Sequence, residues 1–159
     1  ASTSEYVLGG ESIKIVNVDI VDENFVSKNI FTSGDVFQIS VEWEGDSIAS
    51  EICCSFRIDD PSGAVRCSFE GYEHNEYLQS EGPLSGRGRV VYKIENLDLG
   101  MGDYSLSLSL SKKMMPRGKE AILHYIEKVK YFSVKRRVNR ELYVPYEPEF
   151  QLMVDEIIA

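Results

Sequence analysis

Residues 104–111 read YSLSLSLS, and this stretch decides the fold class. Along it, Tyr104, Leu106, Leu108 and Leu110 alternate with Ser105, Ser107, Ser109 and Ser111. Successive side chains of a β-strand point to opposite faces, so a period of two indicates a strand with one apolar and one polar face. The stretch therefore predicts a half-buried strand.

Other runs with strand-like alternation lie before and after residues 104–111 in the sequence. We predict strands at residues 12–21, 36–43, 51–59, 65–70 and 89–94, and a last long run that ends at 131–134. In the first of these, the apolar residues switch parity near Ile15 and Val16, which predicts a β-bulge. Residues 51–59 and 65–70 flank the turn sequence DDPSG, where Pro61 fixes φ and Gly63 tolerates a positive φ. These two runs therefore predict a hairpin.

About seven short strands without a clear amphipathic helix between them predict an all-β fold, an antiparallel β-sandwich. We expect residues 11–135 to form this sandwich and residues 1–10 to be a linker from a domain that precedes it. Residues 136–159 read as a C-terminal tail, extended around Pro145 and Pro148 and apolar after Phe150. Such a tail needs a partner, either its own domain or a second copy.

The net charge, the apolar runs and the cysteines of the chain argue against several kinds of ligand and location. The 159 residues carry a net charge of -9, which argues against nucleic acid as the main ligand and against general adsorption to an anionic membrane. No stretch approaches the roughly 20 apolar residues that span a bilayer. Cys53 and Cys54 are adjacent in a predicted strand, so they point to opposite faces, and we interpret the three cysteines as free thiols in a reducing compartment.

We find no complete motif for catalysis or metal binding in the sequence. Neither a phosphate-binding GxxxxGK[ST] loop nor a GxSxG elbow occurs. His74-Asn75-Glu76 has the H-x-E of zinc deaminases but lacks their Pro-Cys-x-x-Cys, and two histidines cannot form a His-rich metal site.

Acidic residues are plentiful but have no arrangement that indicates a reaction. We interpret the pairs Asp59–Asp60 and Glu73–Glu76 as solvated turn carboxylates rather than a glycosidase pair. Asp19, Asp22 and Glu23, or alternatively Asp59 and Asp60, lack the ligand spacing of a known calcium loop. We therefore predict that the domain is not an enzyme and has no catalytic residue, metal or cofactor.

Aromatic and planar polar side chains favour carbohydrate binding instead, because rings contact the C–H faces of sugars and polar groups bind hydroxyls. The candidate residues lie in the loop after the hairpin, on the outward face of the hairpin and in the serine strip: Tyr72, His74, Tyr77, Arg57, Arg66 and Ser107. For the two arginines the alternative is ion pairing on the surface, and for the tyrosines it is packing of the loop. Trp43 shares the apolar parity of its strand, so we expect it in the core.

Four runs carry a resemblance to a known family. They are Phe31-x-x-Gly34-Asp35, then Ile58-Asp59-Asp60-Pro61-Ser62-Gly63, then Ile94-Glu95-Asn96-Leu97-Asp98-Leu99-x-x-Gly102-Asp103-Tyr104-x-Leu106, and Phe132-Ser133-Val134. Over residues 11 to 135 the chain resembles the C-terminal domain of Wzt, the ATPase subunit of ABC transporters that export O-antigen polysaccharide. These motifs are mostly turn and core positions, and residues 72–88 and 112–119 match no motif of the family.

The resemblance implies a jelly-roll or immunoglobulin-like sandwich that recognises the modified non-reducing end of an O-antigen polysaccharide. It implies a homodimer, with tails that can exchange between protomers, and contact with the transmembrane subunit through an ATPase domain. It also implies a cytoplasmic place at the inner membrane of a Gram-negative bacterium. Two other functions stay open at this point: a protein–protein assembly domain without a working sugar site, and a small glycoside hydrolase of sandwich fold.

Overall fold

The structure is a computed structural model that describes residues 6–48, 52–71, 78, 84–114 and 119–136. The described residues form nine strands: β1 (Tyr6–Gly9), β2 (Ile13–Val21), β3 (Ile30–Thr32), β4 (Phe37–Ile48), β5 (Ile52–Asp59), β6 (Val65–Phe69), β7 (Leu84–Ile94), β8 (Gly102–Met114) and β9 (Lys119–Lys135). This part of the chain contains no helix that could cross a membrane. The predicted all-β class is confirmed.

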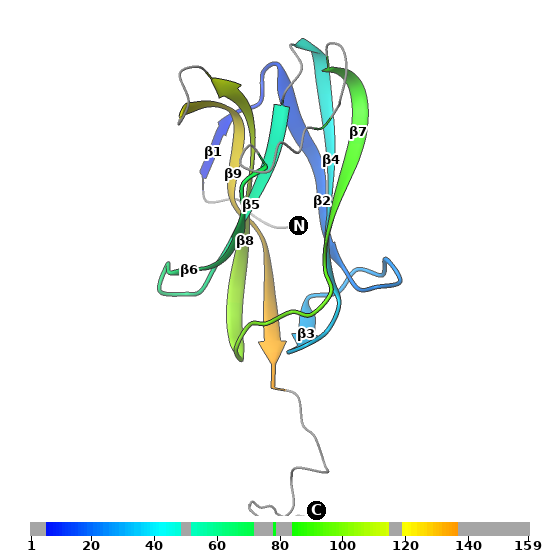
Figure 1. Cartoon of the computed structure of the whole chain (residues 1–159), viewed down its shortest axis with the longest axis vertical. Coiled ribbons are helices and arrows are strands. Elements are labelled where there is room, and N and C mark those ends of the chain that lie inside the picture. The colour runs from blue at the N-terminus through cyan, green and yellow to red at the C-terminus, as the bar shows by residue number, and fades with distance from the viewer. Residues whose placement is uncertain (1–5, 49–51, 72–77, 79–83, 115–118, 137–159) are drawn as a thin grey trace, which may run out of the picture.

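The strands form two sheets that face each other, as Figure 1 shows. The larger sheet has the order β1-β9-β8-β5-β6, and β3 also pairs with β9. The smaller sheet has the order β2-β4-β7. Every pairing is antiparallel except that of β3 with β9, so the predicted antiparallel sandwich is confirmed.

The core lies between the sheets and follows the predicted alternation. The leucines of β8, at 106, 108 and 110, are buried against the apolar face of β4, which includes Trp43 as expected. At the end of the sandwich near β3, four aromatic rings meet: Phe31, Phe37, Tyr104 and Phe132. Aromatic contacts of this kind add to the free energy gained from burial.

Local predictions agree with the structure where a strand is long. The register of β2 against β4 shifts between Ile15 and Asn17, which confirms the bulge. The pairing of β5 with β6 confirms the hairpin, and Gly63 at its turn has a φ of 89°. The three cysteines, all within the described residues, form no disulfide bond, and burial raises the pKa of the Cys54 thiol to about 12.

Two short strands were not predicted. Residues 6–9, expected within a linker, form β1, so the described sandwich begins before residue 11. The polar connection after β2 contains β3. Each pairs with β9 alone, over three or four residues, and such short segments carry no recognisable period. The tail expected at 136–159 lies outside the described residues from residue 137 onward.

A buried histidine links the two sheets. His124 of β9 is 6% exposed, and its Nδ1 accepts a hydrogen bond of 2.8 Å from the backbone N–H of Ile15, next to the bulge of β2. An acceptor at Nδ1 requires the neutral ring. Burial lowers the pKa of His124 below its usual 6.5, while nearby Glu11 opposes this shift and Lys14 favours it.

Mild acid is therefore expected to destabilise the domain through His124. The pKa of this residue is about 6.5 in the unfolded chain and lower in the folded one. The unfolded chain thus takes up a proton first, and stability present above pH 6.5 is lost as the pH falls below that value. We expect the free energy of unfolding to fall between pH 7.5 and 5.5.

The measurement is urea unfolding at both pH values for the native protein and for His124→Asn, whose amide oxygen can still accept the N–H of Ile15. The variant is expected to lose part of the pH dependence. Since His74 is present in both proteins, its contribution cancels in the comparison. Equal pH dependence in the two proteins would contradict a neutral, buried His124.

Candidate functional site

Tyr131 of β9 is the centre of the candidate site. It pairs with Ser105 of β8, while its neighbour Phe132 points into the core, so the Tyr131 ring stands on the outer face of the larger sheet. The ring is 52% exposed, and the residue lines three separate surface hollows. An exposed aromatic ring with space around it is the arrangement that flat, amphipathic ligands use.

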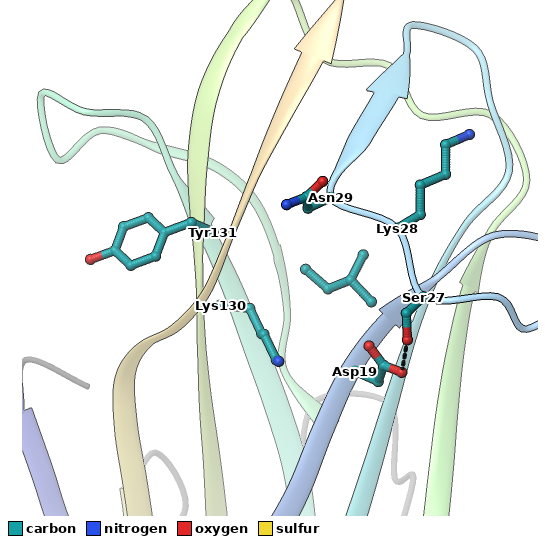
Figure 2. Close-up of a pocket in the computed structure, with 7 residues that line it drawn as sticks. Asp19, Ser27, Lys28, Asn29, Lys130 and Tyr131 are labelled. Atoms are coloured by element: carbon teal, nitrogen blue, oxygen red, sulfur yellow. Dashed lines mark hydrogen bonds between the residues drawn. The ribbon is translucent and has the colours of Figure 1, made fainter. Parts of the chain in front are cut away.

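The first hollow, of about 480 Å³, lies where β9 faces β2 and the loop before β3. Its lining consists of Asp19, Ile20, Ser27, Lys28, Asn29, Lys130 and Tyr131. Figure 2 shows Lys130 reaching towards β2, while the Tyr131 ring extends to the other side of β9. The hydroxyl of Ser27 donates a hydrogen bond to the carboxylate of Asp19, which fixes one acceptor at this wall.

Two smaller hollows also border Tyr131, with volumes of about 400 Å³ and 280 Å³. The first is lined by Asn29, Ile30, Asp103, Tyr104, Tyr131, Phe132 and Ser133, the second by Asp60, Pro61, Asp103, Tyr104, Ser105, Lys128 and Tyr131. A fourth hollow, of about 770 Å³, continues past the hairpin turn and contains Arg66 and the loop before β8. The two smaller hollows and the fourth one all have Asp103 and Tyr104 in their lining, so they adjoin one another and form one depression beside Tyr131.

The carboxylates of this depression are held in place by hydrogen bonds. Asp60 accepts from the hydroxyl and N–H of Ser62, from the N–H of Ala64 and from Nε of Arg66 at 2.8 Å. The bonds from Ser62 and then Arg66 lower the pKa of Asp60 to about 2. The hydroxyl of Ser133 donates to Asp103 at 2.6 Å.

Asp60 can be compared with the acid that a glycosidase uses. A glycosidase needs one carboxylic acid that is protonated near neutral pH, and this requires a raised pKa. The pKa of Asp60 moves the other way, so this residue cannot be the proton donor. Among the described residues, no three histidine, cysteine or acidic side chains gather as metal ligands. The depression offers an aromatic face, fixed acceptors and cationic donors.

The two predicted arginines lie on the outward face of the hairpin, and both are held by a carboxylate. Arg66 pairs with Asp60 and lines the fourth hollow. Arg57 binds Asp59 at 3.0 Å, and its guanidinium donates to the hydroxyl of Tyr125 at 3.4 Å. Arg57 is not among the residues that line the connected depression. Only Arg66 of this pair therefore belongs to the candidate site.

Ser107 does not offer an open surface to a ligand, which corrects the expectation from the sequence. Its side chain points away from the leucines of β8, as predicted, yet the residue is only 2% exposed. Its hydroxyl accepts the backbone N–H of Lys128 at 3.0 Å. Ser105 and Ser111 are buried as well, so the serine strip is covered rather than solvated.

The remaining candidates, Tyr72, His74 and Tyr77, lie outside the described residues. The sequence reading missed Tyr131, Lys128 and Asp103. A signal for Tyr131 was present: its neighbours Phe132 and Val134 have opposite parity in the last strand, which puts a tyrosine on the outward face. For Asp103 and Lys128 we find no comparable signal, because their place in the site depends on strand pairing.

Comparison with known proteins agrees with the fold. The family model of the Wzt C-terminal domain matches residues 4–143. A crystal structure of the C-terminal domain of Wzt superposes with a TM-score of 0.71 at 17% identity, covering 86% of this chain and 82% of the other. The soluble domain of PmoD from Methylocystis sp. ATCC 49242 (Rockwell) matches with a TM-score of only 0.31, at 13% identity over 81% of this chain and 96% of the other. No curated protein sequence matches the chain.

Proposed function

Because the chain belongs to the Wzt C-terminal domain family, we propose that it binds the modified non-reducing end of an O-antigen polysaccharide without catalysing a reaction. Binding would couple the finished glycan to export by an ABC transporter. The observation that carries this proposal is the exposed Tyr131 ring at the centre of a depression lined by fixed carboxylates and by lysine and arginine side chains.

Each part of the depression has a use in glycan binding. The face of the Tyr131 ring suits the C–H face of a pyranose, as aromatic rings in sugar sites do. The carboxylates of Asp60 and Asp103 accept hydrogen bonds from hydroxyl groups. Their geometry is already set by Ser62, Arg66 and Ser133, so little ordering is needed when a ligand binds.

The wider setting is part of the same proposal. In a Wzt protein the domain would be joined to an ATPase, which contacts the transmembrane subunit at the cytoplasmic side of the inner membrane. A homodimer would present two glycan sites to one transporter. Two weak sites close together raise the effective concentration of the polymer near the transporter.

Replacing Tyr131 by alanine is expected to weaken binding of the polysaccharide at least ten-fold, about 1.4 kcal/mol. The ring is the most exposed aromatic side chain in the lining of the depression, and its removal leaves the sugar face without a partner. The measurement is calorimetric titration with the O-polysaccharide of the source bacterium, released from its lipid by mild acid.

Phe25→Ala is the matched control for Tyr131→Ala. Phe25 is an aromatic residue of nearly equal exposure, 51%, in the loop between β2 and β3, and it does not line the depression. The control is expected to bind as the native protein does. Equal affinity of the native protein and Tyr131→Ala would remove Tyr131 from the site.

End recognition requires a separate experiment. Backbone NMR spectra are recorded with the polymer and with the same polymer from a strain that lacks the end-modifying enzyme. The modified polymer is expected to shift amide signals around residues 103–105 and 128–133 at lower concentration. Equal shifts with both polymers would contradict recognition of the modified end.

A further inference from the structure

A bulge in β9 sets the position of Tyr131. On either side of this bulge, Leu108 pairs with Ile126 and Leu106 with Lys130. Three residues of β9 therefore lie opposite the single residue Ser107 of β8. Bulges of this kind re-aim side chains, and they are common beside functional sites.

The bulge displaces everything that follows it in β9. If the pairing of Leu108 with Ile126 continued without the bulge, Tyr131 would lie opposite Asp103. Its observed partner is Ser105, which is two residues, or about 6.7 Å, further along β8. The bulge thus puts the Tyr131 ring between the hollows that Asp60 and Ser133 line.

The bulge has one unfavourable and one stabilising feature. Lys128 has a φ of 54°, a left-handed conformation that residues other than glycine rarely adopt. Its backbone N–H has left the ladder and donates to the hydroxyl of Ser107, which is buried. A buried N–H without an acceptor is costly, so a serine at position 107 stabilises this backbone where alanine could not. Val129 then points into the core.

We propose that Ser107 and the backbone of Lys128 form a positioning element for the glycan site, with Ser107 acting on the ligand only through Tyr131. This inference rests on the proposed function for its ligand, while the geometry that it invokes does not. It gives the buried hydroxyl of Ser107 a role, and strained backbone is characteristic of binding sites.

The test uses Ser107→Ala, with Ser107→Thr as the variant that retains a hydroxyl. Ser109→Ala is the matched control, because it removes a serine hydroxyl from the same strand outside the bulge. In Ser107→Ala, we expect the Lys128 amide to exchange with solvent about ten-fold faster and the Tyr131 amide signal to move. Ser107→Thr and Ser109→Ala are expected to retain the native exchange rate and signal.

A second pair of variants tests the left-handed backbone. A protein with glycine in a strand is normally less stable than one with alanine there, but at a position with a positive φ the order reverses. Lys128→Gly is therefore expected to unfold at a higher temperature than Lys128→Ala. An equal or lower unfolding temperature for Lys128→Gly would overturn the bulge as described.

Glycan titration separates the positioning role from the proposed function. We expect Ser107→Ala to bind the released O-polysaccharide several-fold more weakly than Ser109→Ala. If Ser107→Ala shifts the Tyr131 signal yet binds like the native protein, while Tyr131→Ala does not bind, the positioning role is overturned and the proposed function stands. If the native protein does not bind the polymer at all, the proposed function fails, and the exchange and stability results still decide the bulge.

Discussion

Phe37→Ala is expected to lower the free energy of unfolding by about 3–5 kcal/mol. Phe37 is completely buried, and its ring centroid lies 4.9 Å from that of Phe31 and 4.8 Å from that of Phe132. Alanine would leave a cavity that rings from three different strands and the backbone around them cannot close. The loss includes both the burial of the ring and its aromatic contacts.

The effect of Phe37→Ala should reach the candidate site. Phe132 stacks on Tyr104 with a centroid distance of 5.6 Å, and Tyr104 lines three of the hollows. The measurement is urea unfolding followed by the fluorescence of Trp43, the only tryptophan in the chain. Phe25→Ala, at an exposed position, should change stability by about 0.5 kcal/mol or less. A loss below about 1 kcal/mol for Phe37→Ala would contradict a packed aromatic cluster.

Gly88→Val is the second substitution for which we expect a large effect, a loss of more than about 3 kcal/mol. Gly88 of β7 pairs with Trp43 of β4, and the indole lies directly over it. A Cβ at position 88 would be 2.3 Å from Cζ2 and 2.9 Å from Nε1 of Trp43. The indole is only 5% exposed and belongs to the core, so it can yield only by leaving its packed position.

Two readouts test the contact between Gly88 and Trp43. The free energy of unfolding should fall, and the fluorescence of Trp43 should move to longer wavelength as the indole becomes hydrated. Gly100→Ala is the control, because a Cβ there would meet nothing closer than the Tyr104 hydroxyl at 4.0 Å. A Gly88→Val protein of native stability and fluorescence would refute the close packing of Trp43 on Gly88.

The candidate site was predicted less well than the strands. Arg66 was found because the hairpin fixes its face, and hairpins are local in sequence. Tyr131 was not predicted, although the alternation of side chains in its strand indicates that it faces outward. Ser107 was assigned to the ligand because a serine row looks like a solvated face, whereas Ser105, Ser107 and Ser111 are buried and the Ser107 hydroxyl is bound by the bulge of β9. Parity gives the direction of a side chain but not what lies above it.

The sequence by itself determined the all-β class, most of the strands, the hairpin turn at Asp60 and the bulge of β2. All of these depend on the period of the side chains or on residues a few positions apart. Only the tertiary structure decided the pairing of β1 and β3 with β9, the link from His124 to Ile15 and the assembly of Tyr131, Asp60 and Asp103 around one depression. These contacts join distant segments, and their geometry depends on strand register, in which a bulge of two residues moves a side chain by about 6.7 Å.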